Sequence, residues 1–193
     1  MMNAREWLSE SGQKQHCQTD GVFDLIGNLE EWVLDDWQGR GGSLEGGAWY
    51  TYREYADCSG EYSRQPDYRT PLNREVYSAG FRCCWTPKAP SQTEIRQDAN
   101  KRLKTTAQDT PYQADNEREI LPGVWMDVYE YPNLQGVSPL TGITWNQAQE
   151  LCTSNGKRLC SSTEWELGCG GKRHNAYPYG NTYIADLCPV QLT

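Results

Sequence analysis

The stretch that says most about the fold is GKRLCSSTEWE at residues 156–166, followed by YPYGN at residues 177–181. Within it, Ser161 and Glu164 have the spacing of a capping box, in which a hydroxyl and a carboxylate satisfy free amides at the start of a helix. The pattern predicts a helix that carries Trp165 and Cys169. Gly156 is typical of the residue at which a preceding helix stops.

The preceding helix is predicted over residues 144–152, TWNQAQELC. There Trp145, Ala148, Leu151 and Cys152 recur at helical spacing and share one face. Residues 124–131 before it are strand-like, whereas residues 7–85 consist of short segments punctuated by glycines, which suit loops and short strands. We therefore expect an α+β fold that is irregular and rich in loops.

Composition narrows the class of protein. The chain has 193 residues, room for one ordinary domain or two small ones, and a net charge of −8. This charge argues against a nucleic-acid partner, whose phosphates require clustered Lys and Arg. Eight Trp and twelve Tyr indicate a folded chain with polar-tipped aromatic groups. No apolar run is long enough to span a membrane, and the N-terminus has no apolar segment of a signal peptide.

The eight cysteines indicate an oxidising compartment. They contain no C-x-x-C pair, and with only His16 and His174 present there is no zinc-ligand spacing. An even number of cysteines favours disulfides and therefore an extracytoplasmic location, whether periplasmic, cell-surface or secreted. The sequence alone allows 105 ways of pairing eight cysteines.

The aromatic and cysteine signals fall into two blocks, residues 1–87 and 120–193. Residues 88–119 lack Trp and Cys, are rich in polar residues and read as a linker, with a short helix over residues 94–104.

The quoted stretch resembles the first half of the formylglycine-generating (sulfatase-modifying) enzyme family, which reads GKRLPTExEWE and then YPWGN. Trp145 and Ala148 match the helix that precedes it in that family. GVFDLIGNLEEW at 21–32, GGAW at 46–49 and GFRC at 80–83 look like the family's second half. The two halves therefore stand in reversed order.

The resemblance implies a C-type-lectin-like fold, circularly permuted and stapled by disulfides, with residues 1–193 forming one domain. A permuted chain is expected to be a monomer. The alternative is the end of one repeat joined to the start of the next, which predicts a domain-swapped oligomer.

The family's disulfides imply two pairs here, Cys152–Cys83 and Cys169–Cys58. The remaining cysteines could pair as Cys17–Cys188 and Cys84–Cys160, and an exchange of roles between Cys83 and Cys84 stays open.

The family enzyme oxidises a sulfatase cysteine with copper held by two thiolates, ligands that select Cu(I). Those two positions fall on Thr51 and Ala56, and the serine of the family's GGSW motif is Ala48. We therefore expect no copper and no catalysis. The alternative is a metal-dependent oxidoreductase of the same family with a rebuilt site.

The resemblance also implies a calcium ion, held by the side chains of Asp24 and Glu31 and the carbonyls of Gly27 and Leu29. Hard oxygen donors from a glycine-containing loop suit this ion. The alternative is a turn at Gly27, with Glu31 capping a backbone group or paired with an arginine. A second calcium site of the family is not expected near Pro189, because proline replaces a ligand-type residue.

In lectin-like folds the long irregular loops form the ligand face, here residues 49–77. Tyr and Arg are favoured anchors of recognition surfaces. The candidate ligand-binding residues are Trp49, Tyr50, Tyr52, Arg53, Tyr55, Tyr62, Arg64, Tyr68 and Arg69. They predict a non-catalytic recognition module of the bacterial extracytoplasmic type that binds a protein or a glycan. A domain whose loops vary to recognise different ligands is a further alternative.

Overall fold

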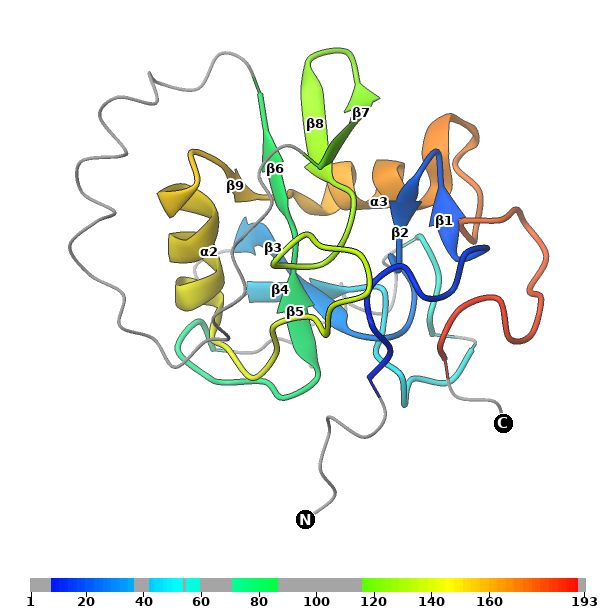
Figure 1. The fold of residues 1–193 in the computed structure, drawn as a ribbon, viewed down its shortest axis with the longest axis horizontal. Coiled ribbons are helices and arrows are strands. Elements are labelled where there is room, and N and C mark those ends of the chain that lie inside the picture. The colour runs from blue at the N-terminus through cyan, green and yellow to red at the C-terminus, as the bar shows by residue number, and fades with distance from the viewer. Residues whose placement is uncertain (1–7, 37–41, 54, 60–70, 87–115, 191–193) are drawn as a thin grey trace.

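The computed structural model describes residues 8–36, 42–53, 55–59, 71–86 and 116–190 (Figure 1). Its elements are mixed helix and strand, in agreement with the expected α+β class. They are, in chain order, β1 (Gln18–Thr19), β2 (Val22–Phe23), β3 (Glu30–Asp36), β4 (Gly42–Glu45), β5 (Ala79–Phe81), β6 (Cys83–Trp85), β7 (Glu117–Leu121), β8 (Val124–Asp127), α2 (Trp145–Ser154), β9 (Arg158–Leu159), α3 (Ser162–Gly170) and the 3-10 helix η4 (Gly171–Arg173).

The strands form three small sheets, with the orders β1-β2, β4-β3-β5 and β7-β8-β6-β9. In the second sheet β3 pairs parallel with β5. In the third, β6 comes from the first half of the chain and pairs antiparallel with β8 and β9 of the second half. Figure 1 shows β6 passing through the middle of the molecule, with α2 on one side and the β1–β2 hairpin on the other. The largest sheet therefore needs both halves of the chain.

Helices α2 and α3 begin where their sequences predict. Thr144 caps α2, because its hydroxyl accepts a hydrogen bond from the amide of Gln147 at 3.2 Å and the Gln147 side chain accepts one from Thr144. The predicted capping box of α3 is present: the Ser161 hydroxyl accepts from the Glu164 amide at 3.2 Å, and the Glu164 carboxylate accepts from the Ser161 amide at 2.9 Å.

The strand predicted over residues 124–131 ends at Asp127. Beyond it the chain turns, because the Tyr129 amide donates to the Asn133 side chain at 3.0 Å. A partner strand, β7, begins at Glu117, inside the segment assigned to the linker. This edge strand starts with charged residues, which protect a sheet edge but hide the alternation that identifies a strand. The expected helix over 94–104 lies outside the described residues.

Two hydrophobic cores hold the fold together, and each draws residues from both halves of the chain. The first is centred on Trp165 of α3, which is fully buried and packs with Val22, Leu25 and Met126. The second packs Trp32 and Phe81 against residues on and around α2, including Ile143, Ala148 and Leu159. The predicted apolar face of α2 is therefore the face that enters the core.

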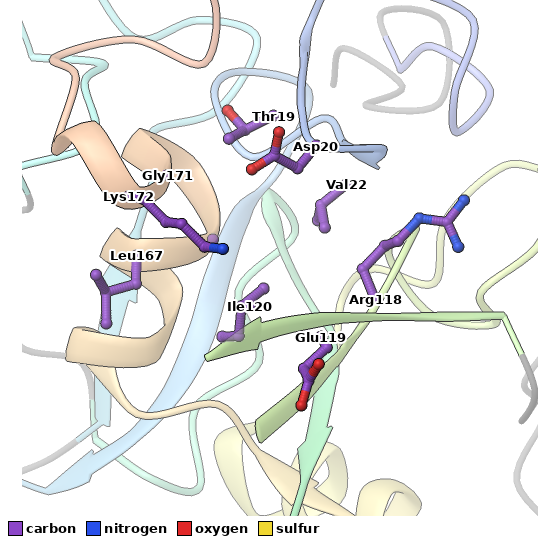
Figure 2. A pocket seen from close by; sticks show the side chains of 10 residues that line it. Thr19, Asp20, Val22, Arg118, Glu119, Ile120, Leu167, Gly171 and Lys172 are labelled. Atoms are coloured by element: carbon purple, nitrogen blue, oxygen red, sulfur yellow. The ribbon is translucent and has the colours of Figure 1, made fainter. Parts of the chain in front are cut away.

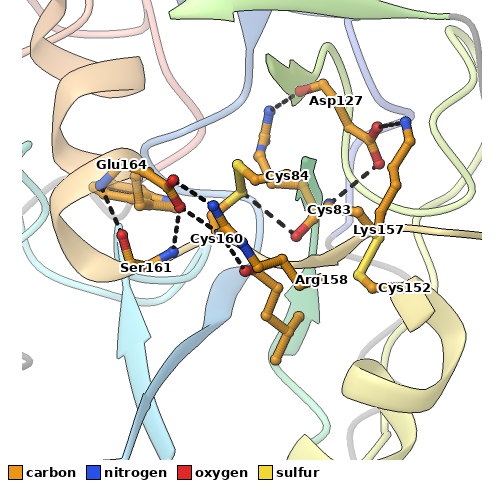
Figure 3. Close-up of a disulfide and its surroundings, with 12 residues drawn as sticks. Cys83, Cys84, Asp127, Cys152, Lys157, Arg158, Cys160, Ser161 and Glu164 are labelled. Atoms are coloured by element: carbon orange, nitrogen blue, oxygen red, sulfur yellow. Dashed lines mark hydrogen bonds and ion pairs between the residues drawn. A yellow bond between two sulfur atoms is a disulfide. The ribbon is translucent and has the colours of Figure 1, made fainter. Parts of the chain in front are cut away.

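Four disulfides join the halves: Cys17–Cys188, Cys58–Cys169, Cys83–Cys152 and Cys84–Cys160. Two of them, Cys83–Cys152 and Cys58–Cys169, are the pairs that the family resemblance implied, and the other two are the pairs given as possible. Figure 3 shows how the adjacent cysteines of β6 diverge, Cys83 toward α2 and Cys84 toward Cys160, which directly follows β9. Successive strand residues point to opposite faces of a sheet, so neighbouring cysteines can reach different partners.

Ion pairs lie beside the Cys83–Cys152 and Cys84–Cys160 disulfides (Figure 3). The Lys157 ammonium lies 2.7 Å from a carboxylate oxygen of Asp127 and also contacts Glu117. The Arg158 guanidinium donates two hydrogen bonds of 2.6 Å to Glu164. Across the segments described, the structure contains no helix with the length and apolar character needed to cross a bilayer.

Candidate recognition surface

A glycine turn after β4 leads into the loop that carries the first of the candidate ligand-binding residues. Gly46 has φ of 84°, and a Cβ there would lie 2.4 Å from the Leu25 carbonyl oxygen and 2.8 Å from the Trp165 ring. A side chain would therefore collide with both backbone and core. The close approach needs glycine and fixes where the following loop leaves the core.

The loop that follows, residues 48–59, is anchored near both ends. The Trp49 amide donates to the Asn28 carbonyl at 3.1 Å, and the Cys58 amide donates to the Ala176 carbonyl at 2.8 Å. The Cys58–Cys169 disulfide ties the far end to α3. Between these anchors the Tyr55 amide donates to the Tyr52 carbonyl at 2.9 Å.

Three tyrosines of this loop expose much of their side chains. Tyr50, Tyr52 and Tyr55 are 43%, 46% and 45% exposed. Arg53 between them is also exposed. Large aromatic groups at the surface mark interaction sites when they gather on one segment. The other candidates of the stretch, Tyr62, Arg64, Tyr68 and Arg69, lie outside the described residues.

A second loop, residues 176–184, joins this surface. The Arg53 guanidinium lies over the Tyr183 ring, 5.6 Å from its centroid, a cation–π arrangement. The Tyr177 ring stacks on Tyr179 at 5.5 Å and meets Tyr183 edge-on at 5.8 Å. Burial, followed by the carboxylate of Asp57, raises the pKa of Tyr177, so this phenol stays protonated at neutral pH.

Sequence reasoning did not include the loop 176–184 in the ligand face, although three tyrosines within seven residues were a usable signal. We define the tyrosine surface as the described residues Tyr50, Tyr52, Arg53, Tyr55, Tyr177, Tyr179 and Tyr183.

Tyr50 and Trp49 also have a structural role. The Tyr50 hydroxyl donates to a Glu30 carboxylate oxygen at 3.1 Å and lies 3.0 Å from the Ser78 hydroxyl. The Trp49 ring meets the Tyr50 ring edge-on at 5.2 Å. Burial, with a contribution from Glu30, raises the pKa of Tyr50. These contacts orient one end of the tyrosine surface.

The positions of the family's copper thiols hold no sulfur. Thr51 uses its hydroxyl to accept a hydrogen bond from the Ala48 amide at 2.9 Å, and Ala56 is 1% exposed. All eight cysteines of the chain are paired in disulfides. The folded, oxidised protein therefore presents no thiolate to a metal.

The loop predicted to bind calcium contains a buried ion pair. Both carboxylate oxygens of Glu31 accept hydrogen bonds from the Arg82 guanidinium, the shortest at 2.6 Å, and one also accepts from the Trp165 indole at 3.1 Å. Burial raises the pKa of Asp24 to about 6, and its carboxylate accepts from the Gly12 amide at 2.5 Å.

A guanidinium therefore lies against both carboxylate oxygens of Glu31. This is the arginine pairing that the sequence left open as the alternative to calcium. Gly27 and Asn28 have φ of 73° and 56°, as in a turn. Within the described segments, no three Asp, Glu, His or Cys side chains form a group suited to a metal ion. Arg82 went unrecognised as the partner of Glu31, since 51 residues separate the two in sequence.

Fold and site together define a disulfide-stabilised, loop-rich α+β domain with an exposed tyrosine surface. Residues 99–190 match the protein family described as the sulfatase-modifying factor enzyme 1-like domain. This part of the chain is therefore similar to that family. The matched range lies in the second half of the chain and does not include the motifs at 21–83.

The chain is similar to two named members over short ranges. It is 43% identical over 44 residues to the formylglycine-generating enzyme of Mus musculus, covering 22% of this chain and 12% of that protein. It is 39% identical over 46 residues to the inactive C-alpha-formylglycine-generating enzyme 2 of Bos taurus, covering 23% of this chain and 15% of that protein. No solved structure matches the chain.

Proposed function

We propose that this protein is a non-catalytic recognition module of an extracytoplasmic compartment, which binds a protein or glycan ligand through the tyrosine surface. The observation that carries the proposal is the anchored loop 48–59, which holds three tyrosines about half exposed around Arg53. Because the loop is fixed at both ends, little conformational entropy is lost when a ligand binds.

Two further observations support a non-catalytic role. All eight cysteine sulfurs are in disulfides, so the thiolates that would bind copper are missing. One named relative, in cattle, is described as an inactive formylglycine-generating enzyme. The four disulfides also fit a compartment in which thiols oxidise.

We extend the proposal to a single circularly permuted, lectin-like domain. Every disulfide joins a residue before position 87 to one after position 116. Strand β6 completes a sheet of the second half, and both cores are shared. One chain thus satisfies its own interfaces, and light scattering should give the mass of a monomer. A stable dimer would favour a swapped repeat fragment.

Calcium binding is a separate proposal for the loop of Asp24, Gly27, Leu29 and Glu31. For Glu31 to serve as a ligand, its carboxylate would have to exchange Arg82 for the ion. Calorimetric titration with calcium after dialysis against a chelator tests this. A measurable affinity that Asp24→Asn abolishes would support calcium, whereas no binding at millimolar calcium would contradict it.

The recognition proposal is tested with a glycan array and with pull-down from extracytoplasmic extracts. Binding should fall at least tenfold when Tyr52 and Arg53 are both changed to Ala, since hot-spot residues of this type contribute about 2 kcal/mol or more. Arg173→Ala, which removes an exposed arginine from η4, is the matched control and should bind like the wild type.

Two results would contradict the proposal. Binding that persists in the Tyr52→Ala, Arg53→Ala variant would place the ligand elsewhere. Stoichiometric uptake of copper or iron together with oxygen consumption would instead identify an oxidoreductase with a rebuilt site.

A further inference from the structure

A cavity of about 310 Å³ lies between the β1–β2 hairpin, β7, α3 and η4 (Figure 2). None of the residues that line it belongs to the tyrosine surface. An adjoining cavity of about 280 Å³ is also lined by Thr19, Asp20, Gly171 and Lys172. The hairpin comes from the first half of the chain and the other walls from the second. The cavity therefore exists only in the assembled fold.

The floor of the cavity is apolar and continuous with the core. Val22 is 1% exposed, and Ile120 packs against the core around Trp165. Leu167 and Gly168 of α3 complete the floor. Such a floor accepts an aliphatic group and gains free energy from covering it.

The walls are held in place by contacts between the hairpin and the end of α3. The Thr19 hydroxyl lies 2.5 Å from the Cys169 carbonyl oxygen and 3.0 Å from that of Pro178. At the hairpin turn the Gly21 amide donates to the Gln18 side chain at 2.7 Å. Gly171 has φ of 62°, and a Cβ there would lie 2.9 Å from Thr19. The two walls thus keep a fixed separation.

One acidic and one basic side chain of the lining, Asp20 and Lys172, are free to pair with a ligand. Figure 2 shows the Lys172 ammonium reaching across the space above Ile120, with the Asp20 carboxylate on the opposite wall. Neither side chain has a hydrogen-bond or ion-pair partner among the described residues.

The other two charges of the lining already have partners. Arg118 donates to the Glu117 carbonyl at 3.2 Å, and Glu119 accepts from the Gly123 amide at 2.8 Å.

The balance of charge decides between classes of ligand. A simple anion would meet the carboxylates of Asp20 and Glu119, and a simple cation would meet Lys172 and Arg118. A zwitterion avoids both conflicts, with its carboxylate on Lys172 and its ammonium on Asp20. The volume is at the lower end of the range for ligand pockets, about 300–1,000 Å³, and selects a small molecule.

We propose that this cavity binds a free α-amino acid with an aliphatic side chain. The ammonium pairs with Asp20, the carboxylate with Lys172, and the side chain covers the partly exposed Ile120 and Leu167. This site is independent of the tyrosine surface, so the double variant Tyr52→Ala, Arg53→Ala keeps it.

Isothermal titration of the full chain with L-leucine tests the proposal without any mutation. We expect saturable binding of L-leucine. N-acetyl-L-leucine, which lacks the ammonium, and L-leucinamide, which lacks the carboxylate, should each bind about tenfold or more weakly, as charge-assisted hydrogen bonds are lost. Glycine, which lacks the aliphatic group, should also bind more weakly.

Variants locate the site. Asp20→Asn and Lys172→Gln should each weaken L-leucine binding about tenfold or more, whereas Glu150→Gln, an exposed acid on α2, should leave it unchanged. No binding at 10 mM L-leucine, on the order of the weakest specific affinities, would overturn the proposal. Equal affinity for leucine and its two blocked analogues, or unchanged binding in both wall variants, would overturn it as well.

Discussion

Replacing Arg82 by Met should destabilise the protein by about 3–5 kcal/mol, the usual cost of leaving one partner of a buried ion pair alone. The Arg82 and Glu31 side chains are each 1% exposed, and their shortest contact is 2.6 Å. Burial alone would lower the pKa of Arg82, but Glu31 outweighs it and the pKa is raised, so the guanidinium is charged in the fold. Met matches the apolar stem but supplies no donor.

The structure shows what the variant would leave behind. Glu31 would keep one hydrogen bond, from the Trp165 indole, and the carbonyl of Phe23 would lose its donor at 2.9 Å. Burial raises the pKa of Glu130 well above its usual value, with further contributions from the nearby carboxylates of Asp24 and Glu31. Removing the guanidinium therefore removes the positive charge that offsets three buried acids.

A double-mutant cycle measures the pair itself. The free energies of unfolding of the wild type, Arg82→Met, Glu31→Gln and the double variant are obtained in guanidinium chloride from tryptophan fluorescence, with the disulfides intact. We expect the double variant to lose less than the sum of the single variants, with a coupling of about 2 kcal/mol or more. The more exposed pair of Arg158 with Glu164, whose side chains are 31% and 13% exposed, is the control, and Arg158→Met should cost no more than about 1 kcal/mol. A loss below about 1 kcal/mol for Arg82→Met, or strictly additive single variants, would refute the argument.

Three further predictions follow from local features. Changing both Cys83 and Cys152 to Ala removes a link between residues 69 apart and should cost about 4 kcal/mol of unfolding free energy in denaturant titrations. Burial would raise the pKa of Glu164, but its hydrogen bonds to a guanidinium and a backbone amide hold that pKa below 4.5. Its stabilising contribution is therefore complete at neutral pH and lost as pH falls through the lowered pKa, and Glu164→Gln should flatten the acid limb of a stability–pH profile. Gly46→Ala should cost at least about 2 kcal/mol, whereas Gly123→Ala, also at positive φ but with no atom near its added methyl, should cost about 1 kcal/mol or less by thermal melting.

The elements that sequence predicted well are those set by local contacts. The capping box of Ser161 and Glu164 and the apolar face of α2 each depend on residues three or four positions apart, so the chain shows them directly. Strand β7 was missed for the converse reason. It begins with charged residues at an exposed edge, and its strand character comes from pairing with β8.

The residues of the tyrosine surface are only partly visible in the sequence. The run that contains Tyr50, Tyr52 and Tyr55 is local, and all three side chains are exposed in the fold, while their role in binding a ligand stays a prediction. Arg53 and Tyr183 are 130 positions apart in the sequence, so their contact could not be predicted from the residues next to either of them.

The sequence by itself determined the helices and their caps, the family motifs, the likeness that led to two of the four cysteine pairs, and the absence of thiols at Thr51 and Ala56. Only the tertiary structure decided that Glu31 pairs with Arg82, that a second loop joins the tyrosine surface, and that Asp20 and Lys172 stand on opposite walls of one cavity. Backbone preferences and caps act over a few residues, so sequence records them. Desolvation and charge pairing depend on which distant segments the cores and disulfides bring together. Those neighbours exist only once both halves of the chain have packed.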